Sequence, residues 1–155
     1  MHYDQYEITR GDNALTFEFV SQGIKGDIEK LVVYSRIELS RMFNLGFGDK
    51  IGLTGDFDDQ AVTNNGDSLK VMATVAATLY LFTDSFPDAS VFVKGSTESR
   101  TRLYRIAITN NLDLISTDFE IYGLKNYVWE AFTIGIDYEA FLVIRKNRKK
   151  NEKRS

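Results

Sequence analysis

The stretch KGSTESRTRLYR, Lys94 to Arg105, has the residue types and spacing best suited to holding an anion. A glycine and two hydroxyl residues come directly after a predicted strand and directly before a predicted helix. The first amides of a helix are free to donate hydrogen bonds, and the helix dipole favours negative charge there. Arg100 falls in the first turn and could bind a phosphate group through both of its terminal nitrogens. The pattern predicts an anion site formed by Gly95, Ser96, Thr97, Arg100 and Tyr104.

A structural role for the same stretch is an equally simple interpretation. Ser96 or Thr97 would then cap the helix, and Arg100 would pair with an acidic side chain of the protein itself. Arg102 and Arg105 form a second basic face of this helix. The glycine is single, and the lysine–serine pair of nucleotide-binding P-loops does not follow it. The residues alone leave both interpretations open.

The missing residue types exclude several kinds of chemistry. The chain has no cysteine and one histidine, His2, which stands near the start. Disulfides and thiolate catalysis are therefore excluded, and neither a Ser–His–Asp triad nor a tetrahedral zinc site is expected. The acidic loop with Asp56, Asp58 and Asp59 lacks the spacing of a calcium-binding EF-hand. We expect an acidic surface loop there, and neither a metal nor a cofactor in this protein.

Strands are predicted from alternating apolar residues and from clusters of β-branched and aromatic residues. Residues 14–23, for example, place Leu15, Phe17 and Phe19 on one face. Trp129 and Phe141 are expected to lie in the core because they belong to two of the closing strands. The other predicted strands are 26–39, 42–49, 89–95, EIYGL, NYVWEAFTIG and YEAFLVIRK.

The clearest helix is predicted from Asp67 to Phe86, with Asp67 as its cap and Pro87 ending it. Its only polar stripe consists of Lys70, Thr74 and Thr78, so the helix should be buried. A second helix runs from Ser99 to about Asn111, and the segment NLDLISTDF adds a turn or two. The order of elements predicts one α+β domain over residues 1–144: a mostly antiparallel sheet, with the long buried helix and a second helix packed on one face.

The charge distribution separates a tail from the domain. Residues 145–155 hold seven basic residues and one acidic residue, whereas the rest of the chain has twelve basic and twenty-one acidic ones. We expect a solvated, disordered tail, because no aromatic residue is interleaved for base stacking and the acidic body would repel phosphates. Any attraction of the tail to nucleic acid is expected to be weak and salt-sensitive. No apolar run reaches the length of a membrane span, and the start lacks the pattern of a secretion signal. A cytoplasmic protein without membrane contact is expected.

The long central stretch TNNGDSLKVMATVAATLYLFTDSFPDASVFVKGSTESRTRLYRIAITNNLDLISTDFEIYG resembles an uncharacterised family of small bacterial proteins, a domain of unknown function. The flanking stretches FEFVSQGIKGDIEKLVVYSRI, FNLGFGD and YEAFLVIRK fit the same pattern. The resemblance covers nearly the whole chain before the basic tail. It implies a cytoplasmic bacterial protein with one α+β domain, and it assigns no catalytic residue.

Three functions remain in view. The first, which we favour, is a binding module for a phosphate-bearing ligand, either a nucleotide or a nucleic-acid backbone, at Gly95–Arg100. The second is a toxin-like ribonuclease that needs no metal and uses Arg100, Arg102, Tyr104 and Arg105. The third is an interaction subunit or homodimer without ligand chemistry. The acidic body weighs against the ribonuclease, so we expect binding rather than catalysis.

Overall fold

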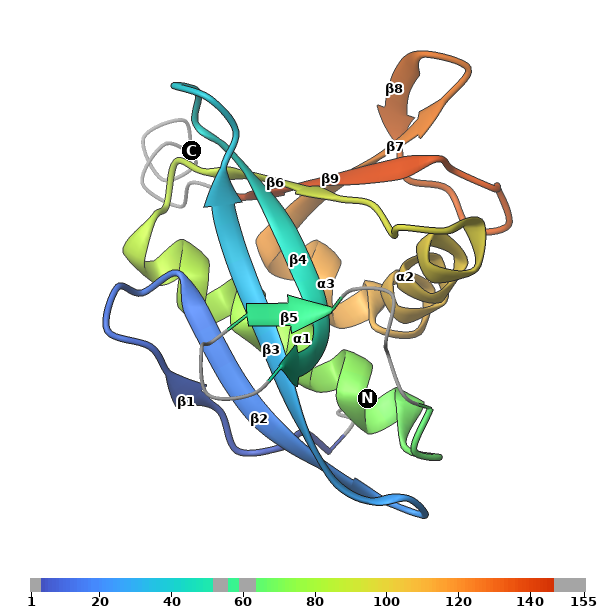
Figure 1. Ribbon diagram of the computed structural model, residues 1–155. Helices are drawn as coiled ribbons and strands as arrows, with labels where there is room; N and C mark the ends of the chain where they lie inside the picture. Colours follow the sequence, from blue (N-terminus) through green and yellow to red (C-terminus); the bar gives the residue numbers. More distant parts are fainter. Residues whose placement is uncertain (1–3, 52–55, 59–63, 147–155) are drawn as a thin grey trace.

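The computed structural model describes residues 4–51, 56–58 and 64–146, which form one sheet of nine strands and three helices (Figure 1). The strands are β1 (Thr9–Arg10), β2 (Thr16–Gly23), β3 (Gly26–Arg36), β4 (Met42–Ile51), β5 (Asp56–Asp58), β6 (Ser90–Val93), β7 (Phe119–Lys125), β8 (Val128–Ala131) and β9 (Ala140–Arg145). The helices are α1 (Ser68–Ser85), α2 (Glu98–Asn110) and α3 (Leu112–Asp118). The predicted α+β domain with a mostly antiparallel sheet is confirmed.

The strand order is β1-β2-β3-β4-β6-β9-β7-β8, with β5 paired to β4 off this path. In the described part of the chain only β4 and β6 pair in parallel, from Met42 opposite Ser90 to Leu45 opposite Val93. A parallel pair needs a crossover, and α1 supplies it behind the sheet. Because β6 runs in the same direction as β4, the chain leaves β6 at the end of the sheet toward which β4 continues. Helix α2 begins there. This topology determines where the residues 94–97 lie.

The core lies between the sheet and the helices and is rich in aromatic rings. Tyr34 of β3 stacks on Phe82 of α1 with ring centroids 4.1 Å apart, and Phe43 of β4 meets Phe82 edge-on at 5.0 Å. The alternation predicted for β2 is confirmed, since Phe17 and Phe19 are buried. Within the described ranges, no helix has the length and hydropathy that a membrane crossing requires.

Two residues of the polar stripe of α1, Thr74 and Thr78, are buried, whereas Lys70 is half-buried. Thr74 Oγ1 accepts a hydrogen bond from the Tyr6 amide at 2.8 Å, and Thr78 Oγ1 lies 2.8 Å from the Tyr34 hydroxyl. Both threonines also donate to carbonyl groups of their own helix. The stripe therefore ties α1 to β3 and to the segment before β1, and its buried hydroxyls are satisfied.

Two expectations about the C-terminal part need correction. Trp129 is 38% exposed on β8 and packs edge-on against Phe92, and Tyr127 beside it is 99% exposed. This hairpin of β7 and β8 extends away from the helices, so its aromatic residues have no core to enter (Figure 1). Arg145, expected to begin the tail, is the last residue of β9, and the Lys146 amide donates to the Asp118 carbonyl at 2.9 Å. The rest of the predicted tail, from residue 147, lies outside the described residues.

Candidate functional site

A pocket of about 310 Å³ lies between the beginnings of α1 and α2, with β3 contributing to its wall. It contains the side chain of Arg100, the strongest anion-binding residue of the sequence prediction. The residues that line it come from β3, from the loop before α1, and from the first turns of both helices: Lys30, Asn64, Asn65, Asp67, Ser68, Val71, Met72, Ser99, Arg100 and Leu103.

The turn between β6 and α2 is organised by hydrogen bonds within the protein. Thr97 is the N-cap residue of α2, and its side chain accepts from the Arg100 amide at 3.2 Å. The Gly95 amide donates to Thr101 Oγ1 at 3.1 Å. A Cβ atom at Gly95 would come within 2.2 Å of the Arg100 Cβ. Glycine is therefore required so that α2 can pack against this turn, and the space beside Gly95 is filled by the helix itself.

The structural interpretation of this stretch expects Arg100 to pair with an acidic side chain, and no such pair occurs among the described residues. Its side chain is half-buried and lines the pocket next to Ser99. Within residues 4–51, 56–58 and 64–146, no hydrogen bond or ion pair of its guanidinium group is recorded. None of the acids in the described ranges therefore neutralises Arg100.

The other predicted site residues do not line this pocket. Ser96 and Thr97 are exposed in the turn, and Arg102 is exposed on the outer face of α2. Tyr104 is only 8% exposed and belongs to the hydrophobic core. Arg105 forms an ion pair with Asp137, with Nη1 and Oδ1 2.5 Å apart. The structure therefore keeps Arg100 at the pocket and separates it from the secondary basic face.

Sequence reasoning missed Lys30, which is 1% exposed and lines the pocket from β3. Its ammonium nitrogen lies 2.5 Å from Asp49 Oδ1 of β4, and the two residues are direct cross-strand partners. A buried ammonium group needs such a partner because desolvation disfavours its charged form. The only signal in the sequence is a lysine within an apolar strand, and its acidic partner is revealed by the strand register alone.

Asp67 occupies the N-cap position of α1, but its side chain does not cap the helix. This corrects the sequence prediction. Its Oδ2 instead accepts from the Tyr6 hydroxyl and from Ser21 Oγ, each at 2.5 Å. Burial, and next the hydrogen bond to Asp67, raises the pKa of Tyr6 above its ordinary value, so the phenol stays a donor at neutral pH. The first turn of α1 has no acidic residue and no side-chain cap, which leaves its amides open to a ligand.

Asn65 joins the loop before α1 to the hairpin of β2 and β3. Its Oδ1 accepts from the Lys25 amide at 2.6 Å, and its Nδ2 donates to the Gly26 carbonyl at 2.8 Å. A Cβ atom at Gly23 would lie 2.0 Å from the Asn65 carbonyl oxygen, so the hairpin can approach the loop only because residue 23 is glycine. This contact positions the wall of the pocket that contains Asp67.

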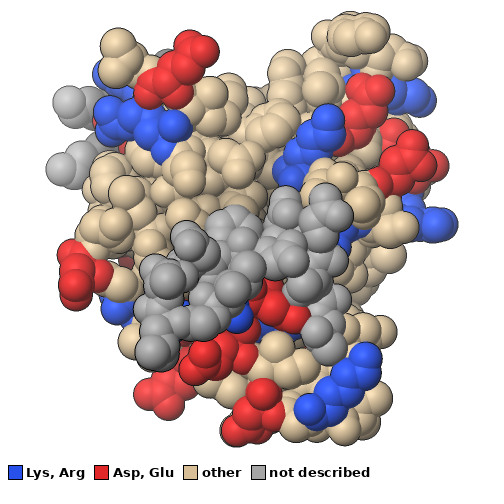
Figure 2. Space-filling view, viewed as in Figure 1, with Lys and Arg blue, Asp and Glu red and all other residues tan. Residues whose placement is uncertain are grey.

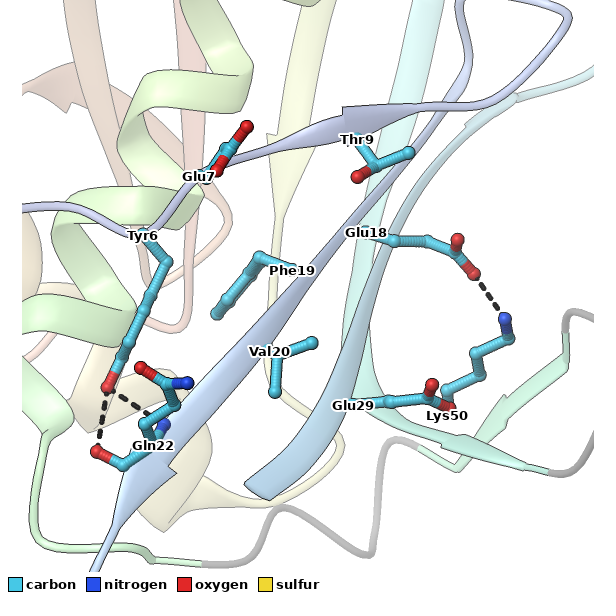
Figure 3. Close-up of a pocket in the computed structure, with 9 residues that line it drawn as sticks. All are labelled: Tyr6, Glu7, Thr9, Glu18, Phe19, Val20, Gln22, Glu29 and Lys50. Carbon is cyan, nitrogen blue, oxygen red and sulfur yellow. Dashed lines mark hydrogen bonds and ion pairs between the residues drawn. The ribbon is translucent and has the colours of Figure 1, made fainter. Parts of the chain in front are cut away.

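A larger hollow of about 530 Å³ lies on the other side of Tyr6, along the outer face of β2 (Figure 3). Three glutamates line it: Glu7, Glu18 and Glu29. Its lysine, Lys50, forms an ion pair with Glu18 at 2.6 Å, which raises the pKa of the Lys50 ammonium group. This acidic hollow is unsuited to a phosphate because its surplus charge is negative.

Among the side chains that the structure describes, no three His, Asp or Glu residues gather in an arrangement that could hold an ion. The side chains of Asp56 and Asp58 in the predicted acidic loop, together with Asp59 and His2, lie outside the described residues.

The comparisons with curated proteins and with solved structures gave no match to this chain. A family model matches residues 2–146, nearly the whole chain up to the basic tail, and the family is described as one of unknown function. This agrees with the resemblance seen in the sequence, although bacterial origin is not part of the finding. The chain belongs to the DUF6934 family.

Proposed function

We propose that the protein binds a small phosphate-bearing ligand in the pocket between α1 and α2. The observation that supports this most directly is Arg100, which lines the pocket without an ion pair among the described residues. An arginine fork binds phosphate through two parallel, charge-assisted hydrogen bonds, which are about twice as strong as neutral ones. A cationic side chain held ready inside a cavity is the feature that an anion-binding site requires.

The two helix beginnings add to the positive character of the pocket. Ser68 and Ser99, each in the first turn of its helix, line the cavity and can donate hydroxyl groups. The α1 amides have no side-chain cap, and the positive end of a helix dipole stabilises a nearby anion by about 0.3–1 kcal/mol. Lys30 adds a buried positive charge, which Asp49 partly offsets. Together these groups favour an anion at this position.

The size and surroundings of the pocket favour a small molecule over a nucleic-acid strand. A volume of about 310 Å³ lies at the lower end of the range for small-molecule sites, about 300–1,000 Å³. On the face shown in Figure 2, the basic and acidic side chains of the described residues are interspersed and form no continuous basic strip. A backbone-binding groove would need such a strip. A mononucleotide or a smaller phosphate ester fits better.

The arrangement favours binding over ribonuclease chemistry. Of the four residues that a metal-free ribonuclease would use here, Arg100 alone lines the pocket. Tyr104 is buried in the core, and Arg105 is paired with Asp137. A general acid or base must reach the proton that it transfers, and neither Tyr104 nor Arg105 lies at the cavity.

The proposal is tested by thermal unfolding and calorimetry with inorganic phosphate and with adenosine monophosphate (AMP). We expect both compounds to raise the melting temperature of the wild-type protein. Arg100→Ala should weaken their binding about tenfold to a hundredfold, the effect of losing a charged hydrogen bond of about 1.5–3 kcal/mol. Arg102→Ala is the matched control, because it removes the same charge from the exposed face of the same helix. Equal losses in the two variants, or no binding to the wild-type protein, would contradict the proposal.

A further inference from the structure

The pocket contains a carboxylate that a site for a bare anion would not need. Asp67 lines the cavity, yet it neither caps α1 nor pairs with Arg100. Its Oδ2 is occupied by the hydroxyl groups of Tyr6 and Ser21. Its Oδ1 has no hydrogen bond in the part of the chain that the structure describes. One carboxylate oxygen is therefore fixed by the protein, whereas the described residues donate no hydrogen bond to the other, and Asp67 lines the cavity.

Arg100 and Asp67 together require a ligand with two different ends. A negative charge beside Asp67 would be repelled, so the phosphate belongs at Arg100. The end near Asp67 must donate hydrogen bonds, because an ionised carboxylate only accepts them. Vicinal hydroxyl groups of a sugar are suitable donors, and carboxylates bind ribose hydroxyls in this way in dinucleotide sites.

The charges around the pocket select neutral donors over an ammonium group. Lys30 and Arg100 both line the cavity, and Asp67 is the only acid among the described lining residues. An amine-bearing ligand would add a third positive charge next to the buried ammonium of Lys30. Hydroxyl groups donate to Asp67 without this repulsion.

The open oxygen of Asp67 is held in place by buried groups. Ser21 is fully buried, and Tyr6 is stacked on Phe19 with ring centroids 5.8 Å apart. The Gln22 amide in turn donates to the Tyr6 hydroxyl at 3.0 Å. Because these contacts are made within the protein itself, they hold the carboxylate in place, and little side-chain entropy is lost when a hydroxyl group binds to it.

We propose that the ligand is a phosphate ester carrying vicinal hydroxyl groups, with its phosphate at Arg100 and its hydroxyls donating to Asp67. This inference rests on the proposed function and names the ligand class of the same pocket. Val71, Met72 and Leu103 form the apolar part of the lining and can pack against a nucleobase. A nucleoside monophosphate and a free sugar phosphate share the recognised chemistry, and the experiment separates them.

The experiment compares dissociation constants of the full-length protein, measured by calorimetry. The ligands are AMP, 2′,3′-dideoxyadenosine monophosphate, ribose 5-phosphate and inorganic phosphate. We expect loss of the two hydroxyls to weaken AMP binding at least tenfold. Ribose 5-phosphate should bind more tightly than inorganic phosphate. A nucleotide site also predicts that AMP binds more tightly than ribose 5-phosphate, whereas a sugar-phosphate site predicts the reverse.

Asp67→Asn provides the second arm. The amide can still accept from Tyr6 and Ser21 through its oxygen, but the negative acceptor is lost. AMP and its dideoxy analogue should then bind equally weakly, while inorganic phosphate binds as before or more tightly. If the variant does not fold, as judged by circular dichroism, the wild-type ligand series still decides.

Equal affinity of the wild-type protein for AMP and its dideoxy analogue would overturn this inference. Phosphate binding that depends on Arg100 would survive that result, so the proposed function would stand without it. Failure of every ligand to bind would overturn both. Tighter binding of phosphoethanolamine than of ribose 5-phosphate would also contradict the inference, because it would assign the Asp67 end of the pocket to an amine.

Discussion

The two hollows beside Tyr6 differ in size and in charge. The larger, along β2, is lined by three glutamates, and its lysine is paired with one of them. The smaller, between α1 and α2, contains Arg100, the buried Lys30, residues from the first turns of both helices and one acid, Asp67. Volume alone would select the first, whereas the balance of charge and hydrogen-bond donors selects the second for a phosphate. The contrast shows that the chemistry of the lining is a better guide to a ligand than the space enclosed.

The lysines of the two hollows illustrate the difference. Lys50 meets Glu18 where both side chains contact water, and ion pairs of this kind contribute little to stability. Lys30 is 1% exposed and its partner Asp49 is 16% exposed, so each would be left poorly solvated without the other. A lysine–carboxylate pair therefore has a structural role in the smaller hollow and contributes little to stability in the larger one.

The largest effect is expected when Lys30 is changed to methionine. The substitution keeps most of the volume but leaves the Asp49 carboxylate without its ammonium partner. Removing one member of a buried ion pair costs about 3 kcal/mol or more, and the urea midpoint of unfolding should fall accordingly. The matched variant Lys50→Met should shift the midpoint far less.

The double variant Lys30→Met with Asp49→Asn sharpens this test. Since the cost arises from a carboxylate that has lost its buried ammonium partner, neutralising Asp49 should recover part of the stability lost in Lys30→Met. If Lys30→Met and Lys50→Met had equal urea midpoints of unfolding, the buried ion pair would be no more important for stability than the exposed one. The contrast between the two hollows would then fail.

A smaller loss is expected from Gly95→Ala. The new methyl group would come within 2.2 Å of the Arg100 Cβ and 2.5 Å of the Thr101 amide nitrogen, so the first turn of α2 must shift. Overpacking of this kind costs about 1–3 kcal/mol, and the displaced Arg100 should bind inorganic phosphate more weakly. Thermal unfolding and calorimetry measure the two effects.

Lys94→Ala is the control in the same turn, because Lys94 is exposed. It should change neither stability nor phosphate binding appreciably. If Gly95→Ala destabilised the protein and left phosphate affinity unchanged, Arg100 would not be the phosphate ligand.

The fold could be predicted to a large extent because its signals are local. The alternation of residues 16–23 and the apolar length of α1 identify their elements without knowledge of the rest of the chain. Trp129 was misjudged because β8 is an edge strand on an extended hairpin, and edge position depends on the order of all the strands. The local sequence pattern therefore predicts the helix or strand to which a residue belongs. It predicts less well whether other elements bury that residue.

The candidate site was predictable only in part, for the same reason. Arg100 was found because it follows a strand-to-helix turn in the sequence. Lys30 was not, because its pairing with Asp49 depends on the register of β3 and β4. Asp67 was assigned to capping, the usual role of an aspartate before a helix. Its actual partners, Tyr6 and Ser21, are distant in sequence, and such contacts leave no local pattern.

The smallest effect is expected from Tyr6→Phe. Tyr6 lines the larger, acidic hollow (Figure 3), and its hydroxyl group donates to Asp67, which lines the smaller one. Phenylalanine keeps the stack on Phe19 but removes the hydrogen bond, so stability at pH 7 should fall by about 1 kcal/mol. AMP binding should weaken only a few-fold, because Ser21 still holds Asp67.

The pH dependence of this loss gives Tyr6 a distinctive signature. The pKa of Tyr6 is raised above its ordinary value of 10.0 by burial and then by the bond to Asp67. The stabilisation is therefore complete below about pH 10, and it is lost as the pH rises through the folded-state pKa. In urea titrations, the gap between wild type and Tyr6→Phe should be constant from pH 7 to 9 and narrow above pH 10. Tyr127→Phe, at an exposed ring, should show no gap at any of these values. If the stability difference widened with pH, the phenol would be more easily ionised in the folded protein. The hydrogen bond from Tyr6 to Asp67 would then not have the effect on stability that we assign to it.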